Sequence, residues 1–463
     1  MITGLITYKE KKCVFKLKGF TLEVDELEDR EKIYIDDLDY IFGESVSTKE
    51  YLPKKLLGKD FENGKDIIFN IRNLASRSPK TYIFNLYSYA VFNKNESSFD
   101  GLTLSGEEFN WFYNIRNAYE YTVVSETGEL QFNIKPFEDL SKTFEFNLED
   151  ELVEGELNVT RQISNMDTSP IKVHTDLYLR FEETTDYSKI HKLINLVADF
   201  FKFVTYRRNI SINHITLSKK DENKDRQITI GTFYINREKN IFTEEGRNLR
   251  ERMIDLQLLE ESMSNLFNRL QKKAIYLTHI PESSVDKRRI TPSRFVMVTA
   301  GFEWQFRLSY EALSNKVEEA SKKDEAKEEL LMFLEEKISS STGEKKKYFK
   351  DEKKKIINMN MSMSSKIEWA LAEFSDILDR FIKDIYNMNQ IKDVKYKDIA
   401  ERIQNQRNDY AHGNIDKEIN SIIGLDLNVL EWLYYTMVLS DIGMSRDNIQ
   451  KTINKLFSRG YAF

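Results

Sequence analysis

The distribution of proline limits the folds open to this chain more than any other feature. The chain has 463 residues and 6 prolines, and no proline follows Pro292. Proline disrupts the interior of an α-helix because it lacks an amide hydrogen and its ring clashes with the preceding turn. The stretch after Pro292 can therefore form long, uninterrupted helices. Thr291 is a good N-cap, and with proline next to it at the first helical position we predict that a helix begins here.

The first 240 residues are instead rich in segments that combine β-branched and aromatic residues, which is typical of β-strands. We predict strands at 65–71, 81–92, 118–125, 130–135, 156–162, 175–181, 210–217 and 227–235. One amphipathic helix interrupts them, because Ile190, Ile194, Val197 and Val204 fall on one helical face. The pattern predicts a sandwich or barrel-like β domain with a packed helix.

The rest of the chain shows helical patterns only. We predict a long amphipathic helix over 243–270, a break at 279–284, and helices at 291–313, 363–387, 394–412, 426–440 and 445–457. The fold class is α+β, with a β-rich domain at 1–240, a helical connector at 241–290 and an all-helical domain at 291–463. The segment 316–356 is dense in lysine and glutamate and predicts a solvated helical pair with a turn at 339–347. The alternative is that its lysines contact RNA, namely Lys345, Lys346, Lys347 and Lys353–Lys355.

Charge and cysteine content exclude several classes of protein. The net charge of −7 argues against a surface built to bind phosphate everywhere, so any nucleic-acid contact should be local. The single cysteine, Cys13, forms neither an internal disulfide nor a thiolate metal cluster, which indicates a cytoplasmic protein. We expect no membrane association, because the first residues lack a signal-peptide core and no stretch reaches about 18 uncharged apolar residues. The histidines lie too far apart in sequence to suggest a metal site, so no cofactor is expected.

The segment QRNDYAHGN at 406–414 carries the clearest chemical pattern. Asn408 and His412 are four residues apart and share one face of a helix, and the long side chain of Arg407 can reach the same edge. Gly413 is a natural first residue beyond a helix end. The carbonyl end of a helix favours a positively charged imidazole, which suits acid–base chemistry on a ribose hydroxyl. Arginine offers a planar, permanently charged group for a phosphate whose charge grows in the transition state.

A similar spacing occurs in RRNISINH at 207–214, with Arg208, Asn209 and His214. That segment alternates like a strand, so that Asn209 and His214 lie on opposite faces. It also lacks a terminal glycine. We interpret His214 as an ordinary strand residue, because short motifs of this kind often occur by chance.

The C-terminal part of the chain resembles HEPN domains. Their signature is an arginine, a polar residue and, four positions later, a histidine at a helix end within a small bundle, which Arg407, Asn408 and His412 match. The segment FEWQFR at 302–307 is similar to an earlier helix of that family. The layout, with a long β-rich half before the HEPN-like half, resembles the ApeA-like abortive-infection proteins of bacteria.

The resemblance implies a metal-independent endoribonuclease in anti-phage defence, with Arg407 and His412 as catalytic residues and Asn408 as a polar supporting residue. It implies RNA substrates, often tRNA, cut by attack of the 2′-hydroxyl to leave a 2′,3′-cyclic phosphate. It also implies a homodimer whose two bundles line one cleft. A constitutive ribonuclease would kill its host, so we expect the activity to be held inactive until a trigger, such as a phage component, arrives. We expect the β-rich domain at 1–240 to be regulatory, so that it senses the trigger or holds the nuclease inactive.

Three acidic or aromatic residues are weaker candidates for supporting roles: Glu303, Asp409 and Tyr410. Glu303 either enters the site and holds Arg407 or pairs with Arg307 one turn later. The alternative for the motif itself is structural: His412 caps the helix, and Arg407 pairs with Glu401 or Asp409.

Two functions compete with the nuclease. A HEPN-type domain can instead serve as a non-catalytic interaction or nucleotide-binding module, in which case the polar triplet binds a partner without cutting RNA. Alternatively, the β-rich half is a ligand or glycan module with an exposed aromatic platform at Trp111, Phe112 and Tyr113. The simpler interpretation of these aromatics is the core side of a strand.

Overall fold

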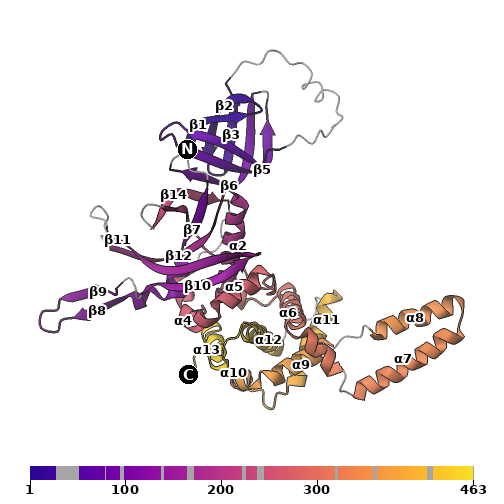
Figure 1. The fold of residues 1–463 in the computed structure, drawn as a ribbon. Coiled ribbons are helices and arrows are strands. Elements are labelled where there is room, and N and C mark those ends of the chain that lie inside the picture. The colour runs from indigo at the N-terminus through magenta and orange to yellow at the C-terminus, as the bar shows by residue number, and fades with distance from the viewer. Residues whose placement is uncertain are drawn as a thin grey trace. The chain divides into compact units, whose positions relative to one another are not determined.

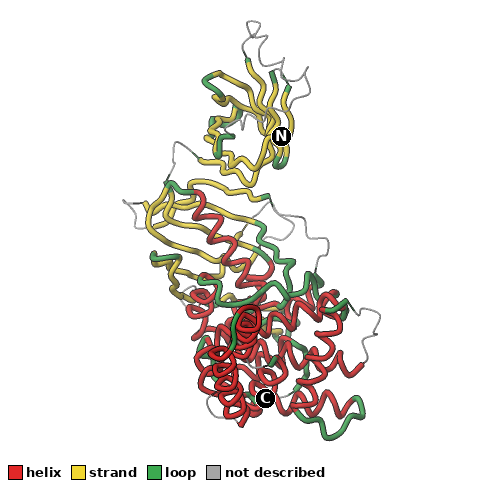
Figure 2. The backbone as a smooth tube through the Cα atoms, turned by 90° about the vertical axis from the view of Figure 1, so that its right-hand side faces the viewer, coloured by secondary structure: helices red, strands yellow, loops and turns green. Residues whose placement is uncertain are grey.

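The computed structural model describes residues 1–27, 52–78, 80–93, 98–136, 140–163, 171–221, 226–236, 244–318, 322–357, 362–413 and 421–461. The chain divides into two compact units. The β unit comprises Met1–Asn195 and Ile210–Thr243, and the helical unit comprises Leu196–Asn209 and Glu244–Phe463. The first unit consists mainly of strands and the second mainly of helices, as the colours of Figure 2 show. From Glu244 on, the predicted connector over 241–290 belongs to the helical unit.

The strands of the β unit pair in antiparallel fashion throughout its described residues. They are β1 Ile2–Tyr8, β2 Lys11–Lys18, β3 Thr21–Glu26, β4 Lys55–Asp60, β5 Asp66–Arg77, β6 Thr81–Phe92, β7 Phe99–Ser105, β8 Tyr119–Val123, β9 Leu130–Ile134, β10 Lys142–Leu148, β11 Glu151–Ile163, β12 Ile171–Thr184, β13 His214–Asp221 and β14 Arg226–Ile235. The predicted strand at 210–217 was wrong at its start, because the strand begins only at His214.

Strand β6, labelled in Figure 1, pairs with β14, β3 and β5 within one twelve-stranded sheet. The strand order is β10-β11-β12-β7-β13-β14-β6-β3-β2-β1-β4-β5, and β5 also pairs with β6. The strands from β6 to β5 in this order therefore close into a barrel, while the others form an open sheet that joins the barrel through β14. Closure removes the unpaired edges that a sheet would otherwise expose. The barrel-like prediction is confirmed, whereas β1 to β4, β7 and β10 were not predicted as strands.

The barrel interior is filled by alternating apolar side chains. On β2, Cys13, Phe15 and Leu17 point inward and are at most 2% exposed. Phe15 fits because its neighbours lack side chains: a Cβ added to Gly4 would lie 2.6 Å from its ring and 2.0 Å from the Lys59 carbonyl oxygen. Gly4 is therefore required by close packing.

Two helices belong to the strand-rich part of the chain: α1 Glu107–Tyr113 and α2 Tyr187–Thr205. The first half of α2 packs on strands, since the Tyr187 ring lies 6.0 Å from the Phe92 ring and 5.4 Å from the Phe99 ring. The predicted helix over 190–204 is confirmed. The second half of α2 is part of the helical unit.

The helical unit is built around α12. Its helices are α3 Gly246–Glu251, α4 Leu256–Leu259, α5 Met263–Gln271, α6 Pro292–Glu318, α7 Lys322–Ser340, α8 Gly343–Ile357, α9 Met363–Glu373, α10 Ser375–Met388, α11 Tyr396–Ala411, α12 Ser421–Asp441 and α13 Arg446–Leu456. Helices α6, α11, α13 and α10 pack against α12. By length and composition α12 could cross a membrane, but 83% of its most apolar stretch is buried in the unit, as in the core helix of a bundle.

The helix starts and stops follow local hydrogen bonding. Thr291 caps α6 as predicted, since its hydroxyl accepts a 3.2 Å bond from the Arg294 amide. The long helix predicted over 243–270 was wrong: the Asp255 carboxylate caps α4 by accepting from the Leu258 amide, so a new helix starts there. The helix predicted over 363–387 likewise breaks, at Phe374, into α9 and α10.

Candidate active site at the end of helix α11

Helix α11 ends as its sequence predicted. The His412 amide donates to the Asn408 carbonyl at 3.0 Å, and the Gly413 amide donates to the Tyr410 carbonyl at 3.2 Å. Gly413 has φ +82°, a left-handed conformation that favours glycine. His412 is exposed, whereas Arg407 and Asn408 are half-buried. The candidate base or acid is therefore open to a ligand at the carbonyl end of the helix.

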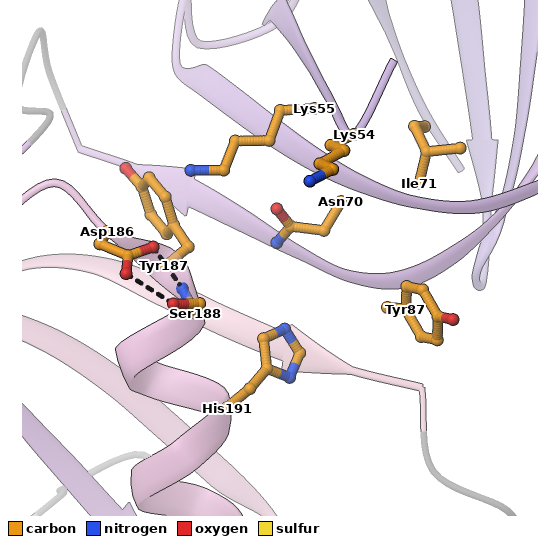
Figure 3. A pocket seen from close by; sticks show the side chains of 9 residues that line it. All are labelled: Lys54, Lys55, Asn70, Ile71, Tyr87, Asp186, Tyr187, Ser188 and His191. Carbon is orange, nitrogen blue, oxygen red and sulfur yellow. Dashed lines mark hydrogen bonds between the residues drawn. The ribbon is translucent and has the colours of Figure 1, made fainter. Parts of the chain in front are cut away.

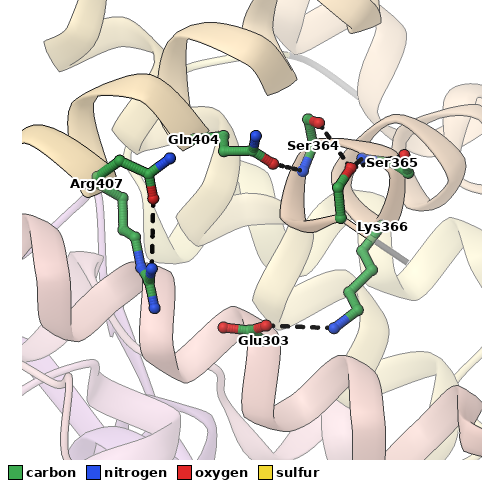
Figure 4. Close-up of polar contacts among 8 residues, drawn as sticks. Glu303, Ser364, Ser365, Lys366, Gln404 and Arg407 are labelled. Carbon is green, nitrogen blue, oxygen red and sulfur yellow. Dashed lines mark hydrogen bonds and ion pairs between the residues drawn. The ribbon is translucent and has the colours of Figure 1, made fainter. Parts of the chain in front are cut away.

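A buried ion pair holds α11 against α12. Arg402 Nε and Nη2 donate to the two oxygens of Asp426, each at 2.8 Å, and Asp426 is fully buried. The Tyr386 hydroxyl on α10 donates to the same carboxylate. A two-pronged arginine–carboxylate contact fixes orientation as well as distance. On the side of α9, the Gln404 side chain accepts a 2.9 Å bond from the Ser364 amide (Figure 4).

Among the cations of α11, Lys397 and Arg402 form ion pairs, whereas Arg407 forms none with a described residue. Its guanidinium donates a 3.4 Å bond to the Asn408 side-chain oxygen (Figure 4) and makes no ion pair with any described residue. Glu401, one of its expected structural partners, pairs instead with Lys397 at 3.8 Å. A half-buried guanidinium without a carboxylate keeps its charge available for an anion.

Glu303 does not make either of its predicted ion pairs. Its carboxylate accepts a 3.3 Å bond from Lys366 on α9, a lysine whose side chain is 11% exposed. Arg307 lies instead over the Trp304 ring, at 4.5 Å from its centroid. The ion pairs predicted for Glu303 were therefore wrong, because Lys366 of another helix binds its carboxylate, while its supporting role in the site stays a prediction. Figure 4 shows Glu303, Lys366 and Arg407 converging from α6, α9 and α11.

Lys366 was missed at the sequence level. It lies in SSKIEWALAEF, after two serines and before an isoleucine, and its carboxylate partner cannot be identified unless the facing helix is known. Within the described chain, the site thus holds a carboxylate paired with Lys366 and a guanidinium, that of Arg407, without an ion pair.

Tyr410 points toward the core of the unit. It is 6% exposed, and its ring meets the Phe295 ring of α6 edge-on at 5.8 Å. Burial raises the pKa of Tyr410. Its hydroxyl and the Gln406 amide nitrogen are both buried, and Gln406 partly opposes the effect of burial on the pKa of Tyr410. Asp409 is half-buried on the same turn.

The structure does not link the predicted RNA-binding lysines to α11. Lys345, Lys346 and Lys347 lie in the first turn and a half of α8, which packs against α7 as the predicted helical pair (Figure 1). Lys353 forms an ion pair with Glu335 of α7. No hydrogen bond or ion pair joins the three lysines to α11 within the described chain.

The second arginine–histidine pattern folds differently. Arg208 pairs with Glu282 at 3.2 Å, and Asn209 is buried and donates to Glu244. His214 is exposed at the first position of β13. The three side chains thus have separate environments, which agrees with an accidental match of spacing.

Trp111, Phe112 and Tyr113 do not form the predicted exposed aromatic platform. Trp111, Phe112 and Tyr113 lie on α1, not on a strand, and Phe112 and Tyr113 are buried. Neither the exposed platform nor the strand core was correct. No group of three or more potential metal ligands occurs among the described residues.

One comparison with known proteins gives a match. Residues 306–448 match the family model described as Apea-like HEPN. Neither the comparison with curated proteins nor the comparison with solved structures gives a match. The matched stretch begins within α6, ends at the start of α13 and contains the whole of α11.

The chain therefore carries a HEPN domain of the all-helical kind predicted from its sequence. This domain resembles those of ApeA-like proteins. At the level of that family, the match supports a nuclease-like role in defence.

Proposed function

We propose that this protein is a metal-independent endoribonuclease of anti-phage defence, with Arg407, Asn408 and His412 as its active site. The observation that carries the proposal is the end of α11: an exposed histidine shares the helix end with a half-buried arginine that makes no ion pair among the described residues. This arrangement lies inside the stretch that matches the Apea-like HEPN family.

The proposed reaction is a transesterification within RNA. His412 takes the proton from a ribose 2′-hydroxyl, and the 2′-oxygen forms a bond to the adjacent phosphorus. The bond from phosphorus to the 5′-oxygen breaks, and that oxygen leaves with a proton. Arg407 stabilises the extra negative charge of the phosphate in the transition state, and Asn408 orients the guanidinium. The products are a 2′,3′-cyclic phosphate and a 5′-hydroxyl, and DNA is not a substrate because it lacks the nucleophile.

Two copies of the chain complete the proposed site. General acid–base catalysis needs one group to take a proton and another to give one, and each α11 end offers a single histidine. A homodimer that places two α11 ends in one cleft supplies both groups. The proposed substrate is tRNA, and the proposed trigger is a phage component. A strict monomer under conditions of RNA cleavage would contradict this arrangement.

The proposal is tested by cleavage of total RNA in EDTA, with and without an added extract of phage-infected cells as the source of the trigger, and with sequencing of the 3′ ends. Wild-type protein should leave cyclic-phosphate ends at defined positions. His412→Ala and Arg407→Ala should each lower the rate by about 100-fold or more, the usual range for a lost acid–base or charge-stabilising group. His214→Ala and Arg208→Ala are matched controls from the second pattern and should cleave normally. Equal cleavage by wild type and His412→Ala would refute the assignment. If the wild type bound RNA or a partner protein but did not cleave RNA, a non-catalytic binding module would be favoured.

A further inference from the structure

The β unit contains a cavity of about 600 Å³ between strands β4, β5 and β6 and the first turn of α2 (Figure 3). Cavities that hold small molecules commonly span about 300–1,000 Å³. This cavity lies outside the stretch that matches the HEPN family. Its lining is rich in polar side chains, which separates it from a packing defect in an apolar core.

A row of polar residues crosses three strands at the cavity. Lys55 on β4 pairs in register with Asn70 on β5, and Asn70 pairs with Ser88 on β6. Directly paired residues share one face of a sheet, so the three side chains project together. The β5–β6 register shifts immediately after Asn70, and bulges of this kind often adjust side chains beside binding sites.

Hydrogen bonds order the polar row. The Asn70 amide donates to the Ser88 hydroxyl at 2.7 Å, and that hydroxyl lies 2.9 Å from His191 Nε2. Burial lowers the pKa of His191, so the ring is neutral at pH 7. The Ser88 hydroxyl accepts from Asn70 and can also donate to Nε2, and in that arrangement the proton of His191 lies on Nδ1 and the cavity gains a ring N–H donor.

The charges at the cavity are mostly positive. Lys54 and Lys55 make no ion pair with a described residue, and the Lys55 ammonium lies 4.8 Å from the centroid of the Tyr187 ring. Asp186 is the one acid among the lining residues, and its two oxygens accept bonds from the Ser188 amide and hydroxyl at 2.9 and 2.5 Å. The carboxylate thus caps α2, and its hydrogen bonds to Ser188 together with the nearby Lys55 charge lower the pKa of Asp186. One acid faces two lysines, so the cavity keeps a positive charge.

An aromatic ring stands beside these donors. Tyr87 of β6 is 53% exposed although it is large and apolar, and it lines the cavity. The Arg72 guanidinium lies 5.7 Å from its ring centroid and adds a third cation near the cavity. An exposed tyrosine ring is a stacking surface for a nucleobase.

We propose that this cavity binds a nucleoside phosphate. The Lys54 and Lys55 ammonium groups hold the phosphate oxygens, Asn70 and His191 donate to the sugar or phosphate, and Tyr87 stacks on the base. An aliphatic ligand would leave two ammonium groups desolvated and unpaired, which costs more than its burial contributes. The proposal is independent of the nuclease, because it concerns binding alone and uses no residue of α11.

Calorimetric titration of the full-length protein tests the site with ATP, GTP, CTP and UTP, and with adenosine and tripolyphosphate as partial ligands. At least one nucleotide should bind at a single saturable site, more tightly than either partial ligand. Lys55→Gln should weaken that binding by about tenfold or more, the loss expected for one charge-assisted contact. Lys59→Gln, on the same strand but outside this cavity, should leave it unchanged.

A second pair of variants separates base stacking from charge. Tyr87→Ala should weaken binding of the nucleotide but not of tripolyphosphate, and Tyr121→Ala, an exposed tyrosine on β8, should change neither. Absence of nucleotide binding, or equal losses in Lys55→Gln and Lys59→Gln, would overturn the proposal. Tripolyphosphate binding as tight as nucleotide binding would also overturn it. RNA cleavage by the same preparations is scored separately, so failure of this site and failure of the nuclease are distinguishable.

Discussion

Replacing His279 with phenylalanine should make the helical unit less sensitive to acid. His279 is 3% exposed, and neither ring nitrogen has a hydrogen-bond partner among the described residues. Its ring stacks on Tyr276 at 5.8 Å and meets Tyr434 edge-on at 4.3 Å. Burial lowers the pKa of His279 to about 3, because a charged imidazole would lose its hydration, and the nearby Arg294 cation disfavours that charge as well.

The sign and size of the effect follow from proton linkage. Between pH 6.5 and pH 3 the unfolded chain binds a proton at His279 that the folded unit does not bind, so folding weakens as the pH falls. From pH 7 to pH 5 this contribution amounts to about 2 kcal/mol, at about 1.4 kcal/mol for each pH unit below 6.5. At pH 7 we expect His279→Phe to be nearly neutral, since relief of two unpaired nitrogens offsets a larger ring.

The measurement is guanidinium unfolding at pH 7 and pH 5 for wild type and His279→Phe. Tryptophan fluorescence reports on the helical unit through Trp304, Trp369 and Trp432. Low protein concentrations are needed because the sequence pI is about 5.6. The variant should lose about 2 kcal/mol less than wild type on acidification. Equal losses in the two proteins would refute the burial argument, since all other titrating groups are common to both.

Three further predictions concern the Arg402–Asp426 ion pair, the C-terminal end of α11 and the β unit. Arg402→Met should destabilise the helical unit by about 2–4 kcal/mol in guanidinium unfolding, because it leaves the buried Asp426 carboxylate without its cation. The control variant Arg446→Met removes only exposed ion pairs and should cost less than about 1 kcal/mol. Gly413→Ala should cost about 1 kcal/mol in the same assay, since φ +82° is unfavourable for alanine. No steric clash should add to this cost, because a Cβ added at this position meets no described atom within 4 Å. The hydrogen bond to Asp176 raises the pKa of His174, so the β unit of the wild type should lose stability as the pH rises above 6.5. If the difference in unfolding free energy between wild type and His174→Gln stayed constant across that range, this reasoning would be contradicted.

Local chemistry made the helical domain predictable. The absence of proline after Pro292, the Thr291 cap and the glycine after His412 act within a few residues, so they can be read without knowing the fold. The break at Asp255 shows the limit of periodicity, because an apolar stripe continued across a residue whose carboxylate caps a new helix.

The barrel was only partly predictable because its closure depends on pairing between distant strands. β6 pairs with β3, β5 and β14, and nothing in the alternation of its own side chains specifies three partners. Strands β2, β3 and β4 carry lysines or acids at their more exposed positions, and β1 contains Gly4, and both features weaken the strand pattern. The class of fold follows from the residues, whereas the register requires the structure.

The same distinction applies to the candidate site. The spacing of Arg407, Asn408 and His412 belongs to one helix and was visible in the sequence. The partner of Glu303 comes from another helix, so only the structure identifies Lys366. This pair changes the electrostatic argument: a carboxylate bound to Arg407 would compete with phosphate for the guanidinium, whereas a carboxylate neutralised by Lys366 does not. A phosphate that approaches the end of α11 therefore meets an arginine whose charge is not already compensated by an acid of the described chain, which is the condition that transition-state stabilisation by Arg407 requires.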